Sequence, residues 1–146
     1  MPPFSIPQFL QDANLPSLTE AAEAEALFTV VTSGGFAGRT YKTVLYRNGS
    51  VAGYLWNGDR YAAPTDLGKV SPQRLQQFVE QLQRSRFEAF NGLHYPVPAG
   101  AADFLTVALR DHRSQSTVQY EDANIERLPE SLARIVQVWT ALLVQR

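Results

Sequence analysis

Residues 27–56, LFTVVTSGGFAGRTYKTVLYRNGSVAGYLW, decide the fold that this chain can adopt. The run 27–32 is dense in β-branched and aromatic residues, and residues 39–47 alternate with a period of two, as half-buried strands do. The connection between these strands consists of Ser33, Gly34, Gly35, Phe36, Ala37 and Gly38. In this connection three glycines surround one aromatic residue. Glycine suits a backbone with positive φ or a close approach, so we expect a tight, open turn here.

A second turn extends the sheet. Asn48-Gly49 is a strong hairpin signal because both residues tolerate a positive φ. Residues 51–56 supply the partner strand, and residues 60–62 a brief return after a further turn. The front half of the chain is therefore predicted to be an antiparallel meander.

The second half of the chain predicts two helices and two more strands. Ser71-Pro72 opens a helix that Asn91-Gly92 stops. Its apolar residues recur at helical spacing, at Leu75, Phe78, Val79 and Leu82. Strands follow at 104–110 and 116–121, and a broad apolar face marks a last helix that begins at Pro129.

These elements define an α+β fold class. We expect one antiparallel sheet of about four to five strands with two main helices on one face, in the order β-β-β-α-β-β-α. Residues 27–146 would form this single domain. Residues 1–26 would form a proline-rich N-terminal arm, apolar enough to dock on a surface, and a short helix from Ser17 to Ala26.

Composition narrows the function classes. The formal net charge is −1 and the basic residues are scattered, which argues against a nucleic-acid partner. The chain has no cysteine and no apolar run of the roughly 20 residues that a membrane span needs, so we expect no membrane insertion. Residues 1–7 have no basic n-region and no apolar h-region, so we expect no signal peptide and a cytoplasmic location.

The motifs of enzymes and cofactor proteins do not occur in the sequence. His94 and His112 lack the spacing of metal ligands, so we expect no metal site and no cofactor. Asp103, Asp111 and Asp122 stand at predicted strand ends, where aspartate usually caps or turns the backbone. The chain is accordingly predicted not to be an enzyme.

Aromatic residues offer binding surfaces instead. Phe36, flanked by glycines, is either a contact for a partner protein or folded under the sheet. Tyr54 and Trp56 share one face of their strand and Leu55 points to the other, so an aromatic platform on the outer face of the sheet is a second binding hypothesis.

The chain resembles the emfourin family of small bacterial proteins over about residues 27–144. The matching segments, in order, are Ser33–Gly38, a Leu- and Gln-rich helix ending near Phe87 and Phe90, Ala102–Val107, Thr117–Asp122, and Leu128–Leu132 leading into the closing helix. Emfourins inhibit thermolysin-like metalloproteases of the protealysin type. The resemblance implies a similar fold and a protein inhibitor that blocks the protease cleft by steric occlusion, with Ser33–Gly38 in the contact surface and Phe36 as anchor.

Two departures from the family keep a second function open. The first 25 residues have no counterpart, and residues 48–68 are longer and more aromatic than in emfourins. The alternative is a scaffold or assembly factor that binds a larger protein complex through its aromatic sheet face and N-terminal arm. Both hypotheses involve a protein partner, with the chain itself a monomer or, through an uncovered edge strand, a homodimer.

Overall fold

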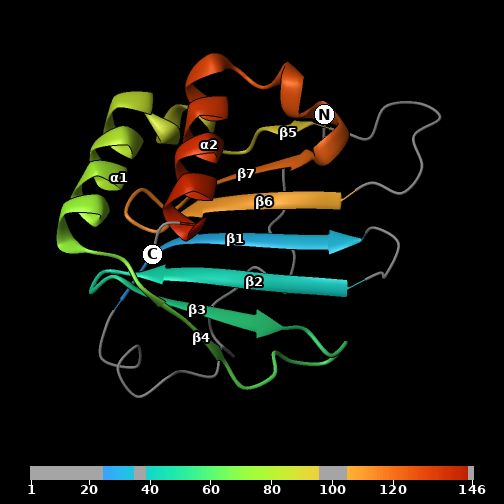
Figure 1. The fold of residues 1–146 in the computed structure, drawn as a ribbon. Helices are drawn as coiled ribbons and strands as arrows, with labels where there is room; N and C mark the ends of the chain where they lie inside the picture. The colour runs from blue at the N-terminus through green and yellow to red at the C-terminus, as the bar shows by residue number, and fades with distance from the viewer. Residues whose placement is uncertain (1–24, 35–38, 96–104, 145–146) are drawn as a thin grey trace.

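The protein is an α+β domain in which one sheet carries two helices. The computed structural model describes residues 25–34, 39–95 and 105–144. The sheet has seven strands in the order β4-β3-β2-β1-β6-β7-β5, and every pair is antiparallel except β5 with β7. Helices α1 and α2 lie together on one face of this sheet (Figure 1).

The strands and helices have the following bounds. The strands are β1 (Ala26–Gly34), β2 (Arg39–Tyr46), β3 (Ser50–Leu55), β4 (Thr65–Lys69), β5 (His94–Tyr95), β6 (Leu105–Asp111) and β7 (Ser116–Glu121). The helices are α1 (Pro72–Ser85), α2 (Glu130–Val144) and two 3₁₀ segments, η3 (Phe87–Phe90) and η4 (Asp122–Arg127). Among the described residues, neither α-helix combines the length and the apolar character needed to cross a membrane.

The predicted hairpin is confirmed. Gly49 has φ +91°, and the Asn48 side chain accepts a hydrogen bond from the Ser50 amide at 2.9 Å, which closes the turn between β2 and β3. The predicted start of α1 is confirmed as well, because Ser71 Oγ accepts from the Arg74 amide at 3.3 Å and Pro72 follows at the first helical position.

The strand count was predicted too low. The return strand is β4 at 65–69, whereas Tyr61 makes only an isolated bridge to Trp56. Strand β5 is two residues long and lies in a segment expected to be loop. Both are edge strands, and their short or polar sequences lack the alternation that reveals a half-buried strand.

Two element boundaries also differ from the expectation. Helix α1 ends at Ser85, because Arg86 takes the left-handed conformation with φ 52°, and the predicted stop at Gly92 ends η3 instead. Ala26 belongs to β1 and Glu25 is not helical, so the expected N-terminal helix does not reach these two residues; residues 17–24 of that helix lie outside the described residues, as does the proline-rich arm.

Phe28 of β1 is the centre of the main core. Its ring lies 5.1 Å from that of Phe78 in α1, 5.8 Å from Phe87 in η3 and 5.2 Å from Trp139 in α2, measured between centroids. These edge-on and tilted contacts are the favourable geometry for aromatic pairs. The predicted apolar stripes of both helices face this core.

Truncating Phe28 should be the most damaging single change in this core. Phe28→Ala should lower the free energy of unfolding by about 3–5 kcal/mol, because three aromatic neighbours would border the cavity. Urea unfolding followed by circular dichroism measures the loss. Phe90→Ala is the matched control, since Phe90 is only partly buried and its loss should be smaller. Equal losses would contradict this account of the core.

Tyr120 of β7 should make the fold sensitive to alkaline pH. Burial, with a further effect of the Asp122 charge, raises the pKa of Tyr120 to about 12 from its ordinary 10.0. The unfolded chain therefore releases this proton first, and stability should fall as pH rises from about 10 to 12, by at most about 3 kcal/mol. Tyr120→Phe should reduce this dependence in urea unfolding at pH 8, 10 and 11. An unchanged slope would contradict the assignment.

Candidate functional site

The predicted glycine turn begins at the C-terminal end of the central strand. Ser33 and Gly34 are the last residues of β1, and Gly34 has φ +95°, which favours glycine. Gly34 pairs with Arg39 of β2 on one side and with Leu105 of β6 on the other. The remaining predicted contact residues lie outside the described residues; they are Gly35, Phe36, Ala37 and Gly38.

The end of the sheet around Gly34 projects beyond the helices. In Figure 1 both helices lie over the left part of the sheet, while the arrowhead of β1 and the beginning of β2 extend to the right of them. Cross-strand pairing aligns Thr32 with Tyr41, and Tyr41 with Leu55, on the helix side of the sheet. We call this surface, formed by Thr32, Gly34, Tyr41, Leu55 and Leu105, the Gly34 rim.

Two leucines make the Gly34 rim apolar. The exposed fraction is 39% for Leu55 and 37% for Leu105, whereas the core leucines are nearly inaccessible. Leu55 ends β3 and Leu105 begins β6, so strands β2 and β1 lie between them. Large exposed aliphatic side chains around a sheet end are a surface that another protein can cover.

Hydrogen bonds fix the side of the rim formed by β6 and β7. The Leu105 amide donates to Asp122 Oδ1 at 3.0 Å, and Thr106 Oγ1 donates to Glu121 Oε2 at 2.7 Å. Both bonds tie the beginning of β6 to the end of β7 or the start of η4. A backbone held in this way presents Leu105 in one position, which lowers the entropy cost of binding.

Tyr41 holds the opposite side of the rim. It is half-buried, and its ring lies over Gly53 of β3, since a Cβ added at Gly53 would overlap the Tyr41 hydroxyl. Glycine at position 53 therefore leaves the space that the tyrosine ring occupies. Sequence reasoning did not single out Gly53, although a glycine inside a strand is a signal of close approach.

The expected aromatic platform is mostly interior. Tyr46, Tyr54 and Tyr61 are buried on the helix-free face, and the hydroxyls of Tyr46 and Tyr54 lie 2.6 Å apart. Burial and this hydrogen bond raise the pKa of Tyr54 far above its usual range. Trp56 packs edge-on against Tyr61 at 4.9 Å and stays half-buried. These rings form a second core and not an open platform.

The histidines and aspartates have structural neighbours. His112 Nε2 lies 2.6 Å from Thr29 Oγ1, and His94 lies beside Gln119 at 3.3 Å. Asp111 accepts from the Arg113 amide and from Ser114 in its turn, which confirms the capping role predicted for it. Asp103 lies outside the described residues. Within the described part of the chain, no group of three or more histidine and acidic side chains is placed to hold a metal ion.

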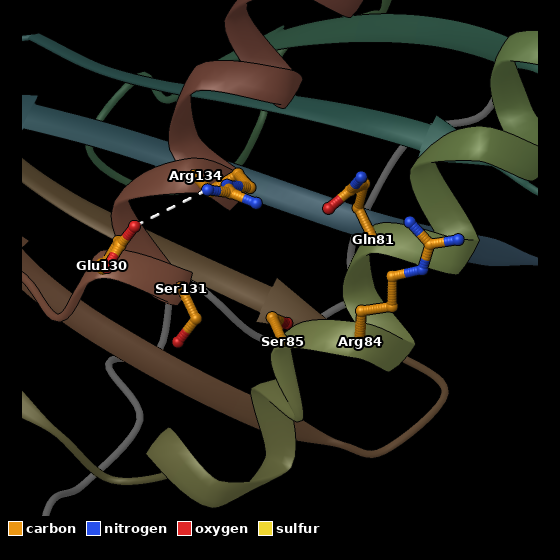
Figure 2. A pocket seen from close by; sticks show the side chains of 6 residues that line it. All are labelled: Gln81, Arg84, Ser85, Glu130, Ser131 and Arg134. Atoms are coloured by element: carbon orange, nitrogen blue, oxygen red, sulfur yellow. Dashed lines mark ion pairs between the residues drawn. The ribbon is translucent and has the colours of Figure 1, made fainter.

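A polar hollow of about 410 Å³ lies between α1 and α2 (Figure 2). Six residues line it: Gln81, Arg84, Ser85, Glu130, Ser131 and Arg134. Its one carboxylate, Glu130, is 3.7 Å from Arg134, and both side chains are largely exposed. Ser85 donates its hydroxyl proton to the Leu82 carbonyl at 2.8 Å. The Ser85 hydroxyl and the Glu130 carboxylate thus each have a partner on their own helix.

No family model matches this chain, and no curated protein matches it significantly.

Filling the space above Gly53 should disturb the rim. Gly53→Ala should lower the free energy of unfolding by about 1–3 kcal/mol, because the new methyl group displaces the Tyr41 ring. The same substitution in a Tyr41→Ala background should cost less. Urea unfolding of the four proteins in this cycle measures the coupling. Additive effects would show that Tyr41 and Gly53 do not share this contact.

Proposed function

We propose that this chain is a non-enzymatic protein-binding domain that binds its partner through the Gly34 rim. The exposure of Leu55 and Leu105 at a sheet end that the helices leave open carries this proposal. Apolar side chains held on regular strands are suitable anchors, because a rigid surface loses little conformational entropy on association.

For the partner we propose a thermolysin-like metalloprotease, which the domain would inhibit or regulate. The resemblance to emfourins supports this class of partner, and the resembling segment Ser33–Gly38 includes Gly34 of the rim. Inhibition would follow from steric occlusion. The rim would cover the active-site cleft and keep substrates out, without contributing a chemical group to the reaction.

The alternative function, a scaffold that uses an aromatic sheet face, receives less support. Tyr54 and Tyr61 are almost inaccessible, at 0% and 3% exposure, so they could not contact a partner without opening the second core. The leucines of the rim need no such rearrangement. The rim therefore remains the preferred contact surface for either kind of partner.

A titration of a thermolysin-like protease with the intact chain tests the proposal. We expect saturable inhibition of peptide cleavage near equimolar ratios. Leu105→Glu and Leu55→Glu should each raise the inhibition constant by about 10-fold or more, because a carboxylate would be desolvated where an apolar anchor was bound.

Val144→Glu is the matched control for this titration. Val144 is 79% exposed at the C-terminal end of α2, which lies away from the arrowhead of β1 (Figure 1). Its substitution should leave inhibition unchanged. Inhibition unaffected by all three variants would contradict the rim as the contact surface. No inhibition by the intact, folded chain would contradict the protease as partner.

A further inference from the structure

The helix-free face of the sheet is closed at its centre, although no described helix lies over it. Val31 of β1 and Ala108 of β6 pair directly on this face and are 1% and 3% exposed. They form a separate apolar cluster, against which no other hydrophobic side chain among the described residues packs. A sheet face open to water would leave a valine partly accessible.

The residues around this pair are buried as well. Thr29, Lys42 and Thr117 lie on the same face, in β1, β2 and β7, and each is at most 1% exposed. The loop after β3 covers the neighbouring part of the face, over Val44, Ala52 and Tyr54, and its Tyr61 ring centroid lies 5.5 Å from Lys42 Nζ. We call Thr29, Val31, Lys42, Ala108 and Thr117 the centre of the helix-free face. His112 lies beside Thr29 and Arg110 donates to Thr117, whereas no described apolar side chain covers Val31 and Ala108.

We propose that the chain's own residues 1–24 dock on the centre of the helix-free face. Val31 and Ala108 are buried within a single chain, which favours an occupant from the same chain over a second copy. The segment joins the sheet at Glu25, whose carbonyl accepts from the Arg47 amide at 2.8 Å beside the beginning of β1. Residues 1–24 thus start from the edge of the face that they would cover.

The composition of residues 1–24 fits this surface. Phe4, Ile6, Phe9, Leu10 and Leu15 are apolar side chains that could cover Val31 and Ala108. The segment has acidic residues but no lysine or arginine, whereas the face carries the buried Lys42 and the half-buried Arg110. Charges of opposite sign therefore meet in the proposed arrangement, as recognition between two surfaces requires.

Length and proline content define how the segment could dock. Residues 1–24 could reach roughly 80 Å when extended, and the nine residues of β1 measure roughly 30 Å, so the segment can cross the face. Pro2, Pro3, Pro7 and Pro16 lack the amide hydrogens that a regular sheet strand donates. Docking over the face through side chains suits such a segment better than adding a strand to β4 or β5.

Paramagnetic labelling of the full-length chain tests this inference, which does not depend on the proposed protease. The chain has no cysteine, so Ser5→Cys and Asn14→Cys each accept a single nitroxide label within the segment. We expect the methyl resonances of Val31 and Ala108 to lose most of their intensity in at least one labelled protein. The methyl groups of Leu132 and Ile135, which are buried residues of α2 on the opposite face, should keep theirs.

A mixed sample separates docking within one chain from docking between two chains. Nitroxide-labelled protein without isotopes is combined with isotope-labelled protein that carries no nitroxide. Retained intensity in this sample, together with broadening in the singly labelled protein, supports docking within the chain. Equal broadening in the mixed sample would overturn the proposal in favour of a second copy. Full intensity of Val31 and Ala108 with both label positions would overturn it altogether.

Discussion

The packing of Phe28 against three aromatic rings organises this domain. β1 is the middle strand of seven, and Phe28 near its beginning contacts one ring each from α1, η3 and α2. Trp139 also packs on Phe78 at 5.6 Å, so the two main helices are held to each other as well as to the sheet. One side chain thereby joins segments more than a hundred residues apart.

The position of this aromatic cluster decides which part of the sheet stays open. Phe28 lies near the beginning of β1, and the helices that pack on it cover that end of the sheet (Figure 1). The other end of β1, at Gly34, receives no helix. Leu55 and Leu105 lie at this end and remain accessible because no helix covers them. The rim is thus a consequence of where the helices dock.

Much of this arrangement could be predicted from residue patterns. Alternation in β2 and β6, the Asn48-Gly49 turn and the Ser71-Pro72 helix start are local signals, and the structure follows them. Sequence patterns did not predict the edge strands β4 and β5, because such strands form where a neighbouring strand has backbone N–H and C=O groups available for pairing. Within the site, a glycine was expected to take a positive φ, and Gly34 does so. The exposure of Leu55 and Leu105 depends on how far the helices extend over the sheet. No local sequence pattern encodes that extent.

The two faces of the sheet impose different constraints on the chain. On the helix face, the helices of the chain cover the sheet except at the Gly34 rim. On the other face, the rings of Tyr46, Tyr54 and Tyr61 and the buried pair Val31 and Ala108 form two further apolar clusters. A sheet that buries side chains on both faces gains rigidity, and a rigid sheet keeps the strand ends of the rim in fixed register. A covered helix-free face therefore helps to keep the Gly34 rim rigid, although the cover and the rim lie on opposite sides of the sheet.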